Sequence, residues 1–416
     1  METAVPKIEG HAAFYTHLKS GHVDKARIIG LENDRFVERI LVGRKYWEAP
    51  IITSRICGIC PVIHNITSTR AIENACNIEV SNQTILLRKL MLAGQMVQSH
   101  SLHLYLLVLP DFVGASSSFE LQRDHPEIFQ NAIELKKYAD RIIETVGGRA
   151  VHPVASVPGG FKSFPTKEKI TALIPIGQKT TEIAETTLRL FATFKYPQLK
   201  REIISSALYL DHEYAIYNGD IWNSKGDIFK AEKYHDYIYE ELKPYTRAKF
   251  GTLKGYEMVV GAAARLNING FKNLSPKTQE LIEEFNITLP LNNPFDNIMA
   301  QAIENHHFAA QSVELLEYFQ KTGVKNEKLV VPSDFGKGTA ACEAPRGTLF
   351  HYYNLDKDGF IEKCDIITPT VQTLPAIEFD LKNLSPLLKD LSPSERSTLI
   401  ETLIRAYDPC ITCATH

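Results

Sequence analysis

Two Cys-x-x-Cys pairs, placed near opposite ends of the chain, constrain its fold more than any other feature. The first pair is Cys57 and Cys60, and the second is Cys410 and Cys413. Each pair puts two sulfurs on one turn, close enough to chelate one metal ion, so the two pairs together supply four thiolates. Zinc ribbons bring their pairs from sequence positions about 15–20 residues apart. Here most of the chain lies between the pairs, so the whole fold must close before they can meet.

The spacing alone leaves several kinds of site open. Four thiolates fit a structural zinc ion, and Cys57-Gly58-Ile59-Cys60 also fits a redox-active dithiol. A thioredoxin-like dithiol is disfavoured because no strand–helix–strand pattern surrounds the pair. Thiolates select zinc, copper(I), nickel or iron, and spacing does not choose among these metals.

The composition indicates a soluble globular protein with a large core. Of 416 residues, 44% are hydrophobic and 23% are charged, which excludes a disordered tail protein, a collagen-like repeat and a disulfide scaffold. The net charge of −3 gives no reason to expect a nucleic-acid partner. The N-terminus lacks the pattern of a signal peptide, and the most apolar stretch, 102–109, is far shorter than the roughly 20 residues of a membrane span. With an odd count of seven cysteines, these features favour the reducing cytoplasm.

Helical periodicity covers most of the chain. The predicted helices are about 66–77, 83–109, 126–146, 167–193, 230–242, 275–285, 297–322 and 393–406. The segment 83–109 is apolar on most faces, which is typical of a helix in the middle of a bundle. Extended segments flank the sequences 19–22 and 356–359, and each of these is typical of a hairpin turn.

We therefore expect an α+β fold that is mostly helical, with a central bundle of long helices and a small N-terminal β region. The β region covers about 8–48, and the helical core covers about 60–330. A C-terminal segment of strands and helix, about 331–416, carries the second cysteine pair. No linker divides the chain, so 1–416 is predicted to be a single domain.

The residues that flank both cysteine pairs, together with four further segments, form a recognisable set. The set comprises Ile8-Glu9-Gly10-His11, Glu38, Arg55-x-Cys57-x-x-Cys60-x-x-x-His64, Glu343-Ala344-Pro345-Arg346-Gly347, Thr368-Pro369-Thr370 and Asp408-Pro409-Cys410-x-x-Cys413-x-x-His416. It resembles the large, catalytic subunit of nickel–iron hydrogenases. Both cysteine motifs match that family in full, and the likeness runs from residue 8 to residue 416.

The resemblance implies the large-subunit fold of these enzymes and their reaction, the reversible heterolytic cleavage of H2 to two protons and two electrons. Nickel would be held by Cys57, Cys60, Cys410 and Cys413. Cys60 and Cys413 would also bridge to an iron ion that carries CO and cyanide ligands. Four thiolates soften the nickel and support its redox cycling.

The resemblance also assigns the acid–base and charge-stabilising roles. Cys410 would act as the base, and Glu9 would relay the proton outward. Arg346 would stand over the open coordination site, with Asp408 orienting it. Outside these motifs, a lone glutamate or arginine would be interpreted as a surface residue. Relatives often carry an aspartate where this chain has Ser99, which weakens the case for a second carboxylate partner of Arg346.

Three further residues would contact the diatomic ligands or a bridging sulfur. Pro345 lies in the Ala-Pro-Arg-Gly segment beside Arg346, and Thr370 resembles a hydrogen-bond donor to cyanide. His64 follows Cys60 by four residues and would donate to its sulfur.

A structural magnesium ion is implied as well. Its ligands would be Glu38, His416 and the main-chain carbonyl near Ile366. Magnesium prefers oxygen ligands and retains waters, so the imidazole rests on the resemblance alone. His100 and His103 are spaced like ligands on the long apolar helix, but we interpret them as hydrogen-bonded core histidines.

The electrons would leave to another subunit. The chain has no Gly-x-Gly-x-x-Gly fingerprint, and Cys76, Cys342 and Cys364 form no iron–sulfur motif and are expected to be buried small residues. The resemblance implies an iron–sulfur small subunit, maturation proteins and an endopeptidase. The motif details resemble cytosolic bidirectional group 3 enzymes, which pass electrons to NAD(P) or another soluble acceptor through further flavin-type subunits.

Alternatives remain open on the sequence. A structural zinc protein with four cysteine ligands and no redox activity would use the same sulfurs. An apo-subunit awaiting nickel insertion would have the same site without its metals. A quinone-site subunit of the respiratory NADH dehydrogenase type shares the fold, but that branch has lost the cysteine pairs that this chain retains.

Overall fold

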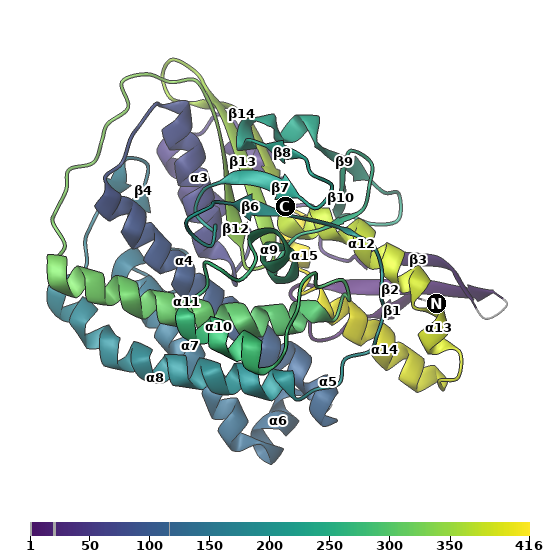
Figure 1. Cartoon of the computed structure of the whole chain (residues 1–416). Helices are drawn as coiled ribbons and strands as arrows, with labels where there is room; N and C mark the ends of the chain where they lie inside the picture. The colour runs from purple at the N-terminus through teal and green to yellow at the C-terminus, as the bar shows by residue number, and fades with distance from the viewer. Residues whose placement is uncertain (1, 20–21, 116) are drawn as a thin grey trace.

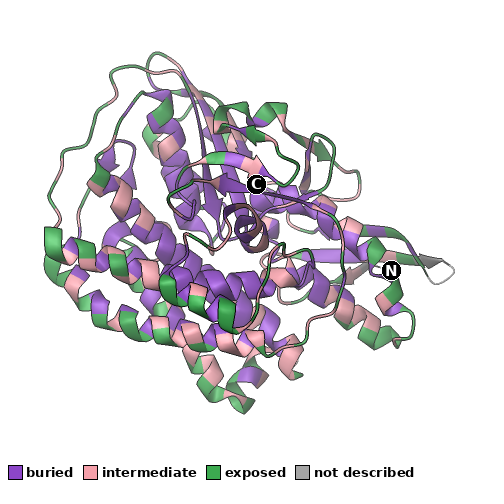
Figure 2. Ribbon diagram, in the orientation of Figure 1, coloured by how far each residue is buried: buried purple, intermediate pink, exposed green. Residues whose placement is uncertain are grey.

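A bundle of long helices forms the centre of the computed structural model, which describes residues 2–19, 22–115 and 117–416 (Figure 1). The bundle helices are α4 (Asn82–Leu102), α7 (Pro126–Gly147), α8 (Lys167–Ala192) and α11 (Asp296–Thr322). α4 is buried on most faces, as its apolar sequence predicts (Figure 2). It continues through a π-helical turn, η2 (His103–Val108), into α5 (Leu109–Val113).

Capping side chains fix where several helices begin. The hydroxyl of Ser81 accepts the Thr84 N–H at the start of α4, and Thr166 caps α8 in the same way. Ser392 and Glu395 form a capping box at the start of α14 (Pro393–Ala406), where the sequence predicts a helix start.

A small antiparallel sheet forms the N-terminal β region, as predicted. Its strands are β1 (Glu2–Ala4), β2 (Ala12–Lys19) and β3 (His22–Gly30), in the order β1-β2-β3. The predicted turn residues Ser20 and Gly21 lie outside the described residues. Short helices lead from this sheet to the first cysteine pair, namely α1 (Val37–Leu41), η1 (Tyr46–Glu48) and α2 (Ala49–Thr53).

A second antiparallel sheet packs against α3 (Pro61–Ala75), the helix that follows the first cysteine pair. Its strands are β12 (Lys337–Ala344), β13 (Gly347–Leu355) and β14 (Ile361–Ile367). β13 and β14 form the hairpin predicted around 356–359. The chain then continues through α12 (Pro369–Asn383), α13 (Ser385–Leu388), α14 and α15 (Ile411–Ala414).

The region between α8 and α11 differs from the prediction, because it holds strands that helical periodicity did not reveal. The predicted helix 230–242 is instead a 3₁₀ helix, η3 (Ala231–Asp236), followed by a strand, β9 (Ile238–Leu242), which pairs with β10 (Lys249–Leu253). A separate sheet contains β11 (Met258–Val259), β6 (Ile204–Tyr209), β7 (Asp220–Asn223) and β8 (Ile228–Phe229). The remaining elements are α6 (Ser118–Asp124), β4 (Ser156–Val157), β5 (Gly160–Phe161), α9 (Ala262–Asn269) and α10 (Pro276–Glu284).

The main hydrophobic core extends from Val5 to Ala414 and includes all four cysteines of the two pairs. We therefore propose that the chain is a single domain. Among the described residues, no single helix is long and apolar enough to span a bilayer, whereas the bent pair Asn82–Val113 and Ser118–Asp124 meets that test by length and composition.

Candidate metal centre

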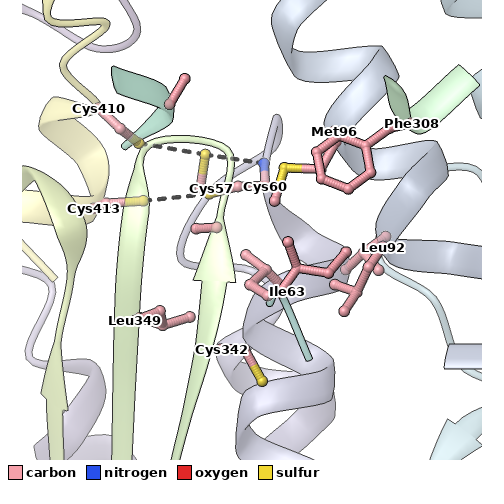
Figure 3. Packing of buried hydrophobic residues seen from close by; sticks show 14 of the residues in the cluster. Cys57, Cys60, Ile63, Leu92, Met96, Phe308, Cys342, Leu349, Cys410 and Cys413 are labelled. Atoms are coloured by element: carbon pink, nitrogen blue, oxygen red, sulfur yellow. Dashed lines mark hydrogen bonds between the residues drawn. The ribbon is translucent and has the colours of Figure 1, made fainter. Parts of the chain in front are cut away.

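Four cysteine sulfurs from the two ends of the chain meet in the protein interior (Figure 3). Cys57 and Cys60 precede α3, whereas Cys410 and Cys413 belong to the turn that forms α15. The sulfurs of Cys60 and Cys413 are 3.5 Å apart, as are those of Cys57 and Cys410. All four sulfurs lie within 4.8 Å of one another. The fold therefore closes over the cysteine pairs as their spacing requires.

The first pair is held by the long helices. Gln95 on α4 accepts the Val62 N–H at 2.9 Å and donates its amide to the Ile59 carbonyl at 2.6 Å. Pro61 occupies the first turn of α3, where its missing N–H costs no hydrogen bond. One buried side chain thus fixes the loop that carries Cys57 and Cys60.

The second pair is held by the start of α12. The Thr370 hydroxyl accepts the Cys410 N–H at 2.9 Å, and the Thr368 hydroxyl donates to the Cys413 carbonyl at 3.0 Å. These bonds satisfy backbone groups that would otherwise be buried without partners.

Glu9 lies directly against the second pair. Its Oε2 accepts from the Cys410 sulfur at 2.9 Å, and its Oε1 accepts from the Thr412 hydroxyl at 2.6 Å. The Glu9 carbonyl also accepts the Ile411 N–H at 3.0 Å. This approach requires glycine at position 10, because Gly10 has a φ of +79° and a Cβ there would lie 3.1 Å from the Thr412 nitrogen. Burial raises the pKa of Glu9 above its ordinary value, and the nearby Cys57 adds to the effect.

Arg346 and Asp408 form a buried pair beside the sulfurs. Arg346 donates from Nη2 to the Asp408 carboxylate and from Nε to the Asp408 carbonyl, both at 2.8 Å. Gln301 on α11 donates to the other carboxylate oxygen of Asp408 at 3.0 Å. Gly347 packs so tightly that a Cβ would lie 2.5 Å from the Val260 Cβ. Burial alone would lower the pKa of Arg346, but Asp408 and the cysteines raise it well above its ordinary value, so the guanidinium is a fixed cation.

The charges of the cluster fit bound metal ions. Hydrogen bonds from Cys410 and the other two cysteines hold the pKa of Cys57 well below its ordinary value, whereas burial raises the pKa of Cys410 and of Cys413 well above it. The protein alone therefore favours few thiolates in this cluster. Metal cations would stabilise the remaining negative charges, since the thiolate is the ligating form.

A small cavity lies beside the sulfurs. Its volume is about 10 Å³, which is room for about one water-sized molecule. Nη1 of Arg346 is buried without a hydrogen-bond partner, and this side chain lines the cavity. An acceptor there, such as a cyanide nitrogen, would satisfy it. The lining residues are Cys60, His64, Ala344, Pro345, Arg346, Leu349, Pro369, Thr370, Cys410 and Cys413.

Comparison with known proteins identifies the family. A family model described as nickel-dependent hydrogenase matches residues 35–127 and 198–416. The chain belongs to this family. The sulfhydrogenase 1 subunit alpha of Pyrococcus furiosus is 33% identical over 99% of this chain and 96% of its own length. The NAD-reducing hydrogenase HoxS subunit beta of Cupriavidus necator is 29% identical over 99% of this chain and 93% of its own length.

A solved structure matches over the full length as well. It is an NAD+-reducing [NiFe]-hydrogenase in the H2-reduced state, which aligns with a TM-score of 0.89 and 25% identity over 100% of this chain and 98% of that chain. The protein is thus the catalytic large subunit of a nickel–iron hydrogenase, an oxidoreductase that acts on H2. Its predicted α+β large-subunit fold is confirmed.

The hydrogenase also brings together the residues predicted for magnesium. The Ile366 N–H donates to Glu38 Oε1 at 2.9 Å, while the Ile366 carbonyl lies 3.0 Å from His416 Nε2. The same imidazole nitrogen is 3.7 Å from Glu38 Oε1. The other nitrogen of His416 lies 2.6 Å from the Cys413 carbonyl, which connects this group to the cysteine cluster.

Two charged residues that were not predicted from the sequence complete this group. The Lys249 ammonium lies 3.3 Å from both oxygens of Glu38 and 3.6 Å from Glu240. Burial would raise the pKa of Glu38, but His416 and Lys249 hold it at about 2. Burial raises the pKa of Glu240 to about 7, and its Oε1 is buried without a partner. An unpaired carboxylate oxygen of this kind fits a hydrated cation.

Several predicted minor features lie as expected. His100 is bonded to Glu304 at 2.8 Å, and His103 is bonded to the Arg405 carbonyl at 2.7 Å, so both are hydrogen-bonded core histidines. The Ser99 hydroxyl is buried without a partner. Three cysteines stay outside the four-sulfur group found among the described residues. Cys76 and Cys342 are buried as expected, whereas Cys364 is only half-buried.

One detail differs from the prediction. His64 Nε2 lies 3.7 Å from the sulfur of Cys413, not of Cys60, with which the sequence paired it. Cys60, His64 and Cys413 all line the same cavity beside the sulfurs.

Sequence reasoning missed residues that support the centre from a distance. Gln95 and Gln301 are buried amides on the long helices α4 and α11. The guanidinium of Arg35 donates to the Thr412 carbonyl, and His351 contacts His64 at 3.3 Å. A polar residue on an otherwise apolar helix was a usable signal for Gln95, whereas nothing local marked Arg35 or His351.

Proposed function

We propose that this subunit catalyses the reversible reaction H2 ⇌ 2H⁺ + 2e⁻ at a nickel–iron centre with CO and cyanide ligands. The observation that carries the proposal is the buried group of four sulfurs between a fixed cation, Arg346, and a carboxylate, Glu9. Cys57, Cys60, Cys410 and Cys413 would hold nickel, and Cys60 and Cys413 would also bridge to iron. When bound, the metal pair supplies the electron-accepting centre at which H2 is polarised.

Cys410 and Glu9 are placed to move the proton. Cys410 is the sulfur within hydrogen-bond distance of Glu9, at 2.9 Å. A carboxyl group whose pKa is raised by burial accepts a proton from a nearby thiol more readily than an exposed carboxyl group does. Glu9 is only partly buried, so a proton that reaches its carboxylate lies near solvent.

Arg346 and its neighbours would shape the site for the diatomic ligands. Asp408 fixes the guanidinium through two bonds, which leaves Nη1 free for an acceptor in the cavity. Pro345 and Thr370 line the same cavity, and the Thr370 hydroxyl keeps its own hydrogen because it accepts the Cys410 N–H. A cyanide there would therefore meet two donors.

A magnesium ion would occupy the group formed by Glu38, the Ile366 carbonyl and His416. Two features support this assignment. Oε1 of Glu240 has no partner, and Nδ1 of His416 contacts the Cys413 carbonyl. The ion would then brace the chain segment that carries the second cysteine pair.

The electrons would pass to an iron–sulfur small subunit. Within the described residues, the cysteines outside the centre form no group that could hold a cluster. The final acceptor would be NAD(P) or another soluble acceptor, reached through flavin-type subunits. The similarity to NAD-reducing hydrogenases supports NAD as that acceptor. We place the enzyme in the cytoplasm, and we expect maturation proteins and an endopeptidase to prepare it, with no nucleic acid involved.

Infrared spectroscopy and metal analysis of the purified hydrogenase complex test this proposal. We expect nickel and iron in equal amounts and absorption bands in the CO and cyanide stretching region. Zinc as the sole metal would support a structural zinc protein with four cysteine ligands. An active sample without those bands would refute the proposed centre, whereas an inactive sample without metals would be the apo-subunit and should gain both bands and activity on maturation.

A further inference from the structure

A line of buried polar side chains runs from the sulfur of Cys413 into the protein. His64 Nε2 lies 3.7 Å from that sulfur, and His64 Nδ1 lies 3.3 Å from His351 Nε2. His351 Nδ1 is 3.0 Å from the Tyr353 hydroxyl, which is 2.8 Å from the Ser68 hydroxyl. All four residues are at most 1% exposed to solvent.

Both imidazoles in this line are neutral. Both rings are fully buried, and within this line they contact a sulfur, another imidazole and a phenol rather than a carboxylate, so burial favours their uncharged form. A neutral imidazole has one donor nitrogen and one acceptor nitrogen. Because each ring uses both nitrogens within the line, the hydrogen bonds must all point in the same direction along it.

The state of Cys413 selects that direction. A thiol would donate to His64, and every bond would then point away from the sulfur. A metal-bound thiolate can only accept, so every bond must point toward it. In that arrangement Tyr353 donates to His351, His351 donates to His64, and His64 donates to Cys413.

The far end of the line can adopt the second direction. The Tyr353 oxygen lies 2.8 Å from the Ser68 hydroxyl, and either of the two hydroxyls can be the donor. Burial raises the pKa of Tyr353 well above its ordinary value, so the phenol keeps its hydrogen. With Ser68 as the donor to its oxygen, that hydrogen is available to His351 Nδ1.

We propose that His351 and Tyr353 are positioning residues which hold His64 in the tautomer that donates to the Cys413 sulfur. The inference rests on the proposed function, in which Cys413 is a bridging thiolate. Hydrogen bonds in a line polarise one another, so the bond that reaches the sulfur is strengthened by those behind it. A sulfur that accepts this bond gives less electron density to the iron, so the line sets an electronic property of the centre.

Tyr353→Phe tests the proposal, because it removes the donor to His351 and keeps the ring. The purified complex should keep its nickel and iron, while the CO band shifts to lower frequency than in the wild type. The shift follows because a sulfur with a weaker hydrogen bond donates more electron density to the iron. Tyr352→Phe is the matched control, since the neighbouring tyrosine on β13 is half-buried and lies outside the line; its band should not move.

Ser68→Ala is the second variant, which removes one hydroxyl at the end of the line and keeps the test open should Tyr353→Phe not fold. It should give a smaller shift in the same direction. An unmoved or raised CO band in the folded, metal-loaded Tyr353→Phe enzyme would overturn the inference, and so would an unmoved band in Ser68→Ala alone. Absence of the bands from the wild type would instead refute the proposed centre, so the two failures are distinguishable.

Discussion

The two halves of the metal centre are held by different kinds of structure. The first cysteine pair continues directly into α3, and Gln95 of the buried helix α4 holds its loop through two hydrogen bonds. The second pair lies on a four-residue helix, α15, and its contacts come from segments far away in the sequence. These segments carry Glu9, Arg346 and Thr370.

The first half of the centre is therefore preorganised by the long helices, whereas the second half depends on contacts with remote segments. Long helices with buried faces open only when much of the protein unfolds, whereas a short segment held by individual side chains opens at lower cost. The first pair is therefore ready to receive metal as soon as the bundle is folded. The second pair reaches its position only when several remote contacts form together.

Removal of one thiolate from either half should have the largest effect. Cys60→Ala and Cys413→Ala each delete a proposed bridging ligand, so we expect both variants to lose nickel and all H2 oxidation. Elemental analysis and a hydrogen-uptake assay check this result. Cys76→Ala, which removes a buried cysteine outside the cluster, should keep both. Retention of nickel in Cys413→Ala would show that the Cys413 thiolate is not required for binding.

Glu9→Gln should leave both metals bound but abolish turnover. The amide cannot take a proton from Cys410, and loss of a general acid–base group typically costs about 10²–10⁴ in rate. Glu32→Gln is the control, because Glu32 contacts the exposed His11 on the same N-terminal segment. Metal content and H2 oxidation are measured side by side. Full H2 oxidation by Glu9→Gln would remove Glu9 from the proton route.

Arg346→Lys should reduce H2 oxidation about 10²-fold with the metals retained. The guanidinium of Arg346 binds Asp408 through two nitrogens and presents its third nitrogen to the cavity. Lysine keeps the positive charge, but its single nitrogen cannot do both. The rate constant at saturating H2 and the infrared bands are the measurements. A variant with wild-type rate would show that charge alone suffices in this half.

Two hydrogen-bond deletions, Gln95→Leu and Thr370→Val, should give the smallest effects and the sharpest comparison. Each leaves buried backbone groups unpaired, at about 1–3 kcal/mol per group. Gln95→Leu should lower the melting temperature of the whole chain, because Gln95 lies on the buried bundle helix α4 and joins it to the start of α3. Thr370→Val should instead reduce nickel retention during dialysis with little change in melting temperature. The opposite pattern would contradict the division into two halves.

The sequence predicted the long helices and the residues of the centre for different reasons. α7, α8 and α11 were predicted from the helical spacing of their apolar residues, so local physics specifies them. The cysteines, Glu9 and Arg346 were identified because their spacing and flanking residues match a family. Their meeting at distances such as 2.9 Å between Cys410 and Glu9 is a property of the whole fold.

Most errors of the sequence prediction concern elements whose partners lie far away in the sequence. Segment 230–242 has helical spacing, but β9 is a strand because β10 supplies its partner, and no local signal announces that pairing. α12 was not predicted, and Pro375 inside it interrupts the usual helix signal. Residues such as Lys249 were missed for a related reason, because their partner Glu38 lies in a different part of the chain.

The contact between Glu9 and Cys410 joins residues 401 positions apart. Contacts between residues so far apart in sequence form late in folding. Closing such a long loop costs chain entropy, and this cost is offset only after most of the chain has become ordered. A partly folded chain therefore cannot pair its proton acceptor with its sulfur ligands. The centre thus acts as a kinetic checkpoint, since redox chemistry becomes available only to molecules that have completed their fold.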